Sequence, residues 1–229
     1  SYLSCTNIMR EYILERVKNT TRHFKFGNCA VHEREKMPEN INLPAILKTI
    51  ENNLPPHYFH DLEGVIIQHI PEFDERNVNA LYRDNKFYIT NRQDNTKDLM
   101  DDIVHEFAHH METLFPKKIY SDQSLMREFR RKRYELKFEL QSEGYWVEEY
   151  DFDNLKYDEK FDSYLYKRVG RNMLRMATTG IFIRPYAAVS LREYFATGFE
   201  AYYLGQQDTL EKISPILFDK IEELHHLAT

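Results

Sequence analysis

One segment of the chain, from about Lys97 to Leu114, constrains the fold more than any other. Its apolar residues recur at helical spacing, Asn95 or Thr96 can cap its start, and Pro116 stops it. The segment contains the run His105-Glu106-Phe107-Ala108-His109. A spacing of four residues places two side chains on one face of a helix, one turn apart. The sequence therefore predicts a helix that presents two imidazoles on one face.

This pattern is typical of a metal site. Two neutral imidazoles at this spacing can bind one zinc ion, and a glutamate beside the metal can take a proton from a bound water. We therefore predict His105 and His109 as zinc ligands and Glu106 as the general base. The alternative is a helix whose surface carries histidine and glutamate without a metal.

Zinc held by two histidines needs at least one further protein ligand. The HExxHxxGxxH type of zinc site is excluded, because Glu112 and Phe115 stand where it requires glycine and histidine. Two other glutamates, Glu128 and Glu193, compete for the third position.

The surroundings of the two glutamates separate them. Glu128 lies 19 positions after His109, a separation seen in aminopeptidase-type and neprilysin-type zinc peptidases. Its neighbours include several arginines, which favours a solvated helix face on which Glu128 pairs with arginine. Glu193 lies in an aromatic, mostly apolar helix, where a buried carboxylate needs a partner such as a metal ion. We favour Glu193 as the third ligand and keep Glu128 as the alternative.

Helical periodicity recurs along much of the remaining chain. The predicted helices cover residues 7–20, 44–53, 190–203 and roughly 208–226. Residues 121–180 are also mainly helical and highly charged, with breaks expected at Gly144 and at 151–154. The basic run Arg127–Arg133 is expected to be a charged helix face, balanced by nearby glutamates.

Strand signals are confined to a short stretch before the histidine helix. Gly64–Ile70 is a β-branched run, and two alternating runs, 80–83 and 86–90, flank the turn Asp84-Asn85. Residues 28–40 are polar, contain a proline and are expected to form a loop. A small, mostly antiparallel sheet is therefore predicted between residues 64 and 90.

Composition limits the classes of protein that fit. The 229 residues are 42% hydrophobic and 30% charged, a globular balance, and a net charge of −6 gives no whole-chain reason to expect nucleic acid or membrane as partner. No apolar run approaches a membrane span, and Ser1–Arg10 lacks a signal-peptide pattern. Cys5 and Cys29 form neither a CxxC pair nor a disulfide framework. A cytoplasmic location, or delivery as part of a larger protein, is favoured; the oligomeric state is not indicated.

The segment Tyr186–Ala196 resembles the catalytic C-terminal segment of the lethal factor-type zinc peptidases. That family includes the protease domain of anthrax lethal factor and the secreted Pro-Pro endopeptidases. It shares HExxH, a tyrosine seven residues before a glutamate ligand, and an aromatic-aromatic-alanine step after that glutamate. Here these elements are Tyr186, Glu193 and Tyr194-Phe195-Ala196, in the same order. The resemblance covers roughly residues 60–115 and 183–225.

The resemblance implies a role for each matched residue. It implies zinc bound by His105, His109 and Glu193, with Glu106 as general base. It also implies that Tyr186 donates a hydrogen bond to the oxyanion that forms during peptide hydrolysis. The chain departs from the family pattern in the 84 positions that separate His109 from Glu193 and in Thr197, where the family tends to have an acidic residue. Pro-Pro specificity is therefore not transferred.

The predicted fold is α+β and zincin-like, with a small, mostly antiparallel sheet packed on the HExxH helix and a helical C-terminal half. We expect one catalytic domain over residues 1–229. Its parts are an N-terminal lobe at about 1–115, a helical insertion at about 117–182 and a C-terminal helical lobe at about 183–229.

The predicted function is zinc-dependent endopeptidase cleavage of a peptide or protein substrate. An extended substrate is expected to pair with an edge strand before the active helix, through Lys86, Phe87, Tyr88 and Ile89. An ordinary sheet strand is the plainer interpretation of these residues. Two other functions stay open: a zincin-fold domain of a larger toxin or virion protein with a binding or structural role, and an aminopeptidase that uses Glu128 as third ligand.

Overall fold

The computed structural model of the protein describes residues 22–227. The chain divides into two compact units, Ser1–His110 and Met111–Thr229. The division falls within a single helix, α4 (Thr96–Leu114), which contains both predicted histidine ligands. The helix predicted over residues 7–20 lies outside the described residues.

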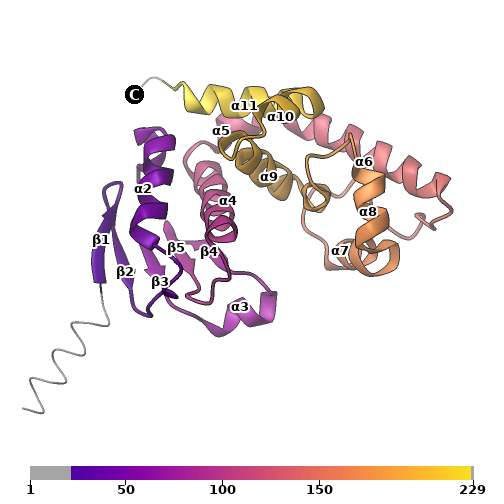
Figure 1. Ribbon diagram of the computed structural model, residues 1–229. Helices are drawn as coiled ribbons and strands as arrows, with labels where there is room; N and C mark the ends of the chain where they lie inside the picture. Colours follow the sequence, from indigo (N-terminus) through magenta and orange to yellow (C-terminus); the bar gives the residue numbers. More distant parts are fainter. Residues whose placement is uncertain (1–21, 228–229) are drawn as a thin grey trace, which may run out of the picture. The chain divides into compact units, whose positions relative to one another are not determined.

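The first unit is built on a five-stranded mixed sheet, whose strands Figure 1 shows side by side in the indigo-to-magenta part of the ribbon. The strands are β1 (Arg22–Phe26), β2 (Cys29–Glu33), β3 (Gly64–Ile67), β4 (Ala80–Arg83) and β5 (Lys86–Ile89). Their order is β1-β2-β3-β5-β4. The β1–β2 and β4–β5 pairs are antiparallel, whereas β2–β3 and β3–β5 are parallel. The prediction of a mostly antiparallel sheet confined to 64–90 is therefore wrong.

The β1–β2 hairpin occupies part of the predicted loop over 28–40, which corrects that prediction. A Gly27-Asn28 turn joins the strands, and Gly27 has a φ of +58°, in the left-handed region that glycine adopts without strain. In β2 the alternate side chains Cys29, Val31 and Glu33 are buried. A strand with a buried glutamate in its pattern does not show the apolar alternation on which the prediction relied.

Helices connect the strands of the first unit: α2 (Leu43–Asn53), the 3-10 turn η1 (Pro56–Phe59) and α3 (Pro71–Arg76). The helix predicted over 44–53 is confirmed as α2. A crossover helix between consecutive strands allows parallel pairing, which explains the β2–β3 pair. The predicted hairpin is also confirmed, since Asp84 and Asn85 both adopt the positive φ of a tight two-residue turn.

Helix α4 packs on the sheet through Phe107. Its ring centroid lies 4.9 Å from that of Phe87, 5.1 Å from that of Phe59 and 5.7 Å from that of Phe26. All four rings are buried. Edge-to-face contacts of this kind add to the stabilisation from buried apolar area. The predicted packing of the HExxH helix on a sheet is therefore confirmed within the first unit.

The described part of the second unit is helical, as predicted for the C-terminal half, and Figure 1 shows it in pink, orange and yellow. Its elements are α5 (Pro116–Tyr120), α6 (Ser124–Ser142), α7 (Glu159–Ser163), the π-helical η2 (Tyr164–Gly170), α8 (Arg171–Thr178), the 3-10 turn η3 (Pro185–Ala188), α9 (Leu191–Tyr203), α10 (Gln207–Ile213) and α11 (Pro215–His225). The predicted breaks at Gly144 and 151–154 lie between α6 and α7. The final predicted helix, 208–226, is two helices, because Pro215 cannot continue α10.

The basic run on α6 is only in part the solvated face that its charges predicted, because Arg127, Arg130 and Arg131 are exposed whereas the next two cations are buried. Lys132 and Arg133 are 3% and 1% exposed. Both donate hydrogen bonds to backbone carbonyls of other segments, and burial lowers the pKa of each. The prediction of a charged, exposed face is therefore wrong for Lys132 and Arg133.

In the part of the chain that the structure describes, none of the helices has both the length and the apolar character that a membrane span requires.

Candidate metal centre

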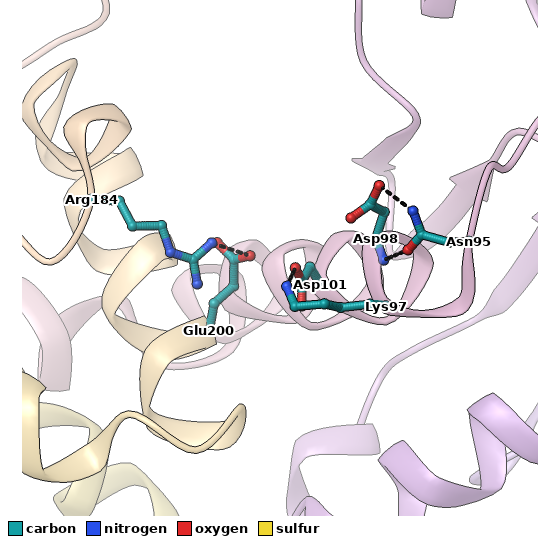
Figure 2. A network of polar contacts seen from close by, with 6 residues as sticks. All are labelled: Asn95, Lys97, Asp98, Asp101, Arg184 and Glu200. Carbon is teal, nitrogen blue, oxygen red and sulfur yellow. Dashed lines mark hydrogen bonds and ion pairs between the residues drawn. The ribbon is translucent and has the colours of Figure 1, made fainter. Parts of the chain in front are cut away.

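The start of α4 is fixed by a reciprocal pair of hydrogen bonds, which Figure 2 shows at the labelled residues Asn95 and Asp98. Asn95 Oδ1 accepts from the backbone N–H of Asp98 at 2.8 Å, and Asn95 Nδ2 donates to the Asp98 carboxylate at 2.8 Å. This confirms Asn95 as the cap of the helix. A fixed first residue sets which side chains face the same way further along.

The two histidines lie on one face of α4, as their spacing predicts. The rings of His105 and His109 are 5.0 Å apart between centroids, with an angle of 78° between their planes. His105 is half-buried, whereas His109 is buried. Glu106, between them in sequence, is also buried, at 8% exposure.

Glu193 stands in the first turn of α9. Ser190 caps this helix, since its hydroxyl accepts a hydrogen bond from the backbone N–H of Glu193 at 3.1 Å. The predicted helix from a Ser190 cap to Tyr203 is therefore confirmed. Glu193 itself is half-buried, and the next nine residues of α9 are buried.

His105, His109 and Glu193 form a group that can hold a metal ion. Each offers one ligand atom, and these atoms all lie within 4.8 Å of one another. Two imidazole nitrogens and one carboxylate oxygen are the protein ligands of several catalytic zinc sites, which keep a fourth position for water or substrate. The donor set thus fits zinc, although the same ligands also suit other divalent transition metals.

Glu128 belongs to another arrangement. It is 3% exposed, and its carboxylate accepts hydrogen bonds from the Tyr194 hydroxyl and from the backbone N–H groups of Ile216 and Leu217. Those two N–H groups lie in the first turn of α11 and have no partner within that helix. The prediction that Glu128 pairs with arginine on a solvated face is wrong, because its actual partners are far away in sequence.

Tyr186 lies in η3 and is 40% exposed. Partial burial, followed by the nearby charge of Glu193, raises the pKa of its phenol. The hydroxyl therefore stays protonated at neutral pH and can donate a hydrogen bond. Asp162, Tyr166 and Tyr157 also contribute to this pKa, so residues of the predicted insertion lie around Tyr186.

Strand β5 contains the predicted substrate-binding residues Lys86, Phe87, Tyr88 and Ile89, but it is not an edge strand. It pairs with β3 on one side and β4 on the other. Its backbone groups are therefore committed to the sheet and cannot bind an extended substrate by strand addition. An edge position is predicted for this strand from the sequence because the parallel β3–β5 pair leaves no local signal. In the described sheet, β4 is the outer strand on that side.

One carboxylate contact near the site was missed from the sequence. Glu112, three residues after His109, accepts a hydrogen bond from the Tyr120 hydroxyl at 2.6 Å. The Arg192 guanidinium, next to Glu193 in sequence, lies 3.7 Å from the same carboxylate. Residues three apart on a helix share a face, so the position of Glu112 relative to His109 was a usable signal.

Comparisons of the chain with protein-family models, with curated proteins and with solved structures find no match. The resemblance to the lethal factor-type peptidases therefore stays a prediction from the sequence.

Proposed function

We propose that this chain is a zinc-dependent endopeptidase with a zincin-like fold. The observation that carries the proposal is the group of His105, His109 and Glu193, whose ligand atoms lie within 4.8 Å of one another. The buried Glu106 strengthens it, because a purely structural zinc site has no need of a carboxylate at that position.

The three ligand residues come from two helices with defined starts. Asn95 caps α4, and Ser190 caps α9 one turn before Glu193. Ligand residues on capped, buried helices lose little freedom when they bind a metal, which favours tight binding. When bound, zinc supplies Lewis-acid chemistry that lowers the pKa of a water and polarises a scissile carbonyl.

Glu106 and Tyr186 complete the proposed reaction. The Glu106 carboxylate takes a proton from the attacking water and delivers it to the nitrogen of the leaving amine. The Tyr186 hydroxyl, which stays protonated at neutral pH, donates a hydrogen bond to the carbonyl oxygen as negative charge develops on it. The substrate class is a peptide or protein, since these groups match amide hydrolysis by a metal-activated water.

The experiment compares cleavage of an unbiased peptide library by the zinc-loaded wild type and by Glu106→Gln. Glu75→Gln, which changes an exposed glutamate of α3, is the matched control. We expect the wild type and Glu75→Gln to cleave, a strong chelator to abolish cleavage, and added zinc to restore it. Glu106→Gln should bind zinc normally and lose at least about 10²-fold in kcat, the contribution of a general base.

Two outcomes contradict the proposal. One is a wild-type protein that binds zinc but cleaves no member of the library or of a set of unfolded proteins. The other is equal cleavage by the wild type and Glu106→Gln, which would assign the activity to a contaminant or to another group.

A further inference from the structure

Arg133 of α6 is a buried cation with no role in the proposed reaction. It is 1% exposed, and its guanidinium lies over the rings of Phe161, at 4.2 Å from the centroid, and Phe129, at 4.8 Å. Burial lowers its pKa to about 10, and three nearby aspartates oppose that shift. The group therefore stays charged at neutral pH. A charge in this environment requires hydrogen-bond acceptors on every side.

The acceptors of Arg133 are four backbone carbonyls from two segments. Nε donates to Ala188 O at 2.5 Å, and Nη2 donates to Val189 O at 2.9 Å. Nη1 donates to Phe152 O at 3.2 Å and to Asn154 O at 3.3 Å. One planar fork of donors thus holds both segments in a fixed relation, which a single point charge cannot do equally well.

The first of these segments lies between two residues of the proposed site. Ala188 is the last residue of η3, two positions after Tyr186, and Val189 follows it and precedes Ser190, the cap of the helix that carries Glu193. A backbone bond from Leu191 N to Leu155 O, at 2.8 Å, ties the same two segments together. A further hydrogen bond, from Arg184 Nη1 to Glu200 Oε1, joins the residue before η3 to α9 and is drawn in Figure 2. Its donor–acceptor distance is 3.2 Å.

We infer that Arg133 is a positioning residue for the proposed metal site, because its bonds to Ala188 O and Val189 O fix the backbone between Tyr186 and Glu193 and its bonds to Phe152 O and Asn154 O anchor it to a second segment. This inference rests on the proposed function, because Arg133 affects catalysis only if the site binds zinc. Arg133 contacts neither the metal nor the substrate; it acts through the turn at Ala188 and Val189. A residue that orients a metal-binding side chain without itself binding the metal lowers the metal affinity when it is removed.

Lys132, the preceding residue, provides a matched control. It is also buried, and its Nζ donates to Ile181 O and Ile213 O, each at 2.6 Å. Neither carbonyl belongs to the 186–193 segment. Lys132→Met therefore removes a buried cation from the same helix without releasing the carbonyls of Ala188 and Val189.

The experiment compares the wild type, Arg133→Met, Arg133→Lys and Lys132→Met of the full chain. The first readout is backbone amide hydrogen exchange of residues 186–193 in the metal-free protein. The second is zinc affinity by competition with a chromogenic chelator. We expect exchange about tenfold faster and zinc binding about tenfold weaker in Arg133→Met, with a smaller change of the same sign in Arg133→Lys. Lys132→Met should lower the melting temperature yet leave both quantities within about twofold of wild type.

The outcomes separate this inference from the proposed function. If wild type binds no zinc, the proposed function fails, and the exchange data still decide whether Arg133 orders the segment. If Arg133→Lys and Lys132→Met exchange residues 186–193 at the same rate, the inference is overturned. Should Arg133→Met fail to fold, Arg133→Lys decides, because lysine keeps the charge but cannot hold both segments.

Discussion

The Tyr194 hydroxyl donates a hydrogen bond of 2.6 Å to Glu128 Oε1, and Tyr194 is the residue that follows Glu193. Both partners are buried. The same carboxylate accepts from the first backbone N–H groups of α11, Ile216 and Leu217. Glu128 thus joins α6, α9 and α11, which assigns it a role in stability.

Replacing Glu128 with alanine should therefore destabilise the protein without removing a ligand. The change leaves one buried hydroxyl and two helix-terminal N–H groups without this acceptor, at a cost of about 3 kcal/mol. Urea unfolding at neutral pH measures it. Tyr194→Phe should cost about 1 kcal/mol, and the double variant less than the sum, because the two residues share a bond. Strictly additive losses would contradict the assigned contact.

Tyr186→Phe tests the proposed oxyanion donor. Removing the hydroxyl should lower kcat by about 10²-fold and leave KM and zinc content nearly unchanged, since the bond forms with the developing charge. Tyr157→Phe is the control, because it removes a hydroxyl from a tyrosine near Tyr186 that has no role in the proposed reaction. That hydroxyl donates a hydrogen bond to Asp162. A parallel fall in kcat for both variants, or a rise in KM alone, would argue against the assigned role.

The ion pair between Asp122 and Lys220 should make the stability of the folded protein depend on pH in the acid range. Lys220 Nζ donates to the Asp122 carboxylate at 2.7 Å and holds the pKa of that carboxyl well below its usual range. A carboxyl whose pKa is lowered in the folded state stabilises the fold at pH values above its pKa in the unfolded chain, which is about 4. This contribution fades as the pH falls further. The melting temperature of Asp122→Asn should lie below that of wild type at pH 6, with the gap closing from about pH 4 downward. Asp219→Asn controls for the lost charge, and a gap independent of pH would contradict the assignment.

Gly27→Ala should lower the free energy of unfolding by more than the strain of its positive φ alone would. Gly27 has a φ of +58°, and an added Cβ would lie 2.3 Å from a ring atom of Phe59, which packs on Phe26 and Phe107. We expect a loss of roughly 3 kcal/mol. Gly144→Ala is the matched control, since its φ is +87° with no atom within 4 Å of the added Cβ; about 1 kcal/mol is expected there. Equal losses in thermal or urea unfolding would show that Phe59 can move.

Features with local signals were predictable from the sequence. The cap at Asn95, the turn at Asp84-Asn85 and the cap at Ser190 each depend on residues within a few positions. Helix α9 carries two carboxylates, and burial does not single out Glu193: it is half-buried, whereas Glu200 is buried and accepts a hydrogen bond from Arg184.

Features set by distant partners were not predictable in this way. The parallel β3–β5 pair, which places β5 inside the sheet, leaves no trace in the alternation of either strand. Glu128 and Arg133 sit in a highly charged run, yet both are buried because their partners lie on segments far along the chain. A buried polar group becomes predictable only when its acceptor or donor is known.

The central claim is that His105, His109 and Glu193 together bind zinc. Zinc per chain, measured by mass spectrometry after exhaustive dialysis against a weak chelator, tests it most directly in wild type, Glu193→Gln and Glu128→Gln. We predict one zinc in wild type and in Glu128→Gln, and loss of zinc from Glu193→Gln because an amide is a poor zinc ligand. Equal zinc in wild type and Glu193→Gln, or zinc lost only from Glu128→Gln, would contradict the account.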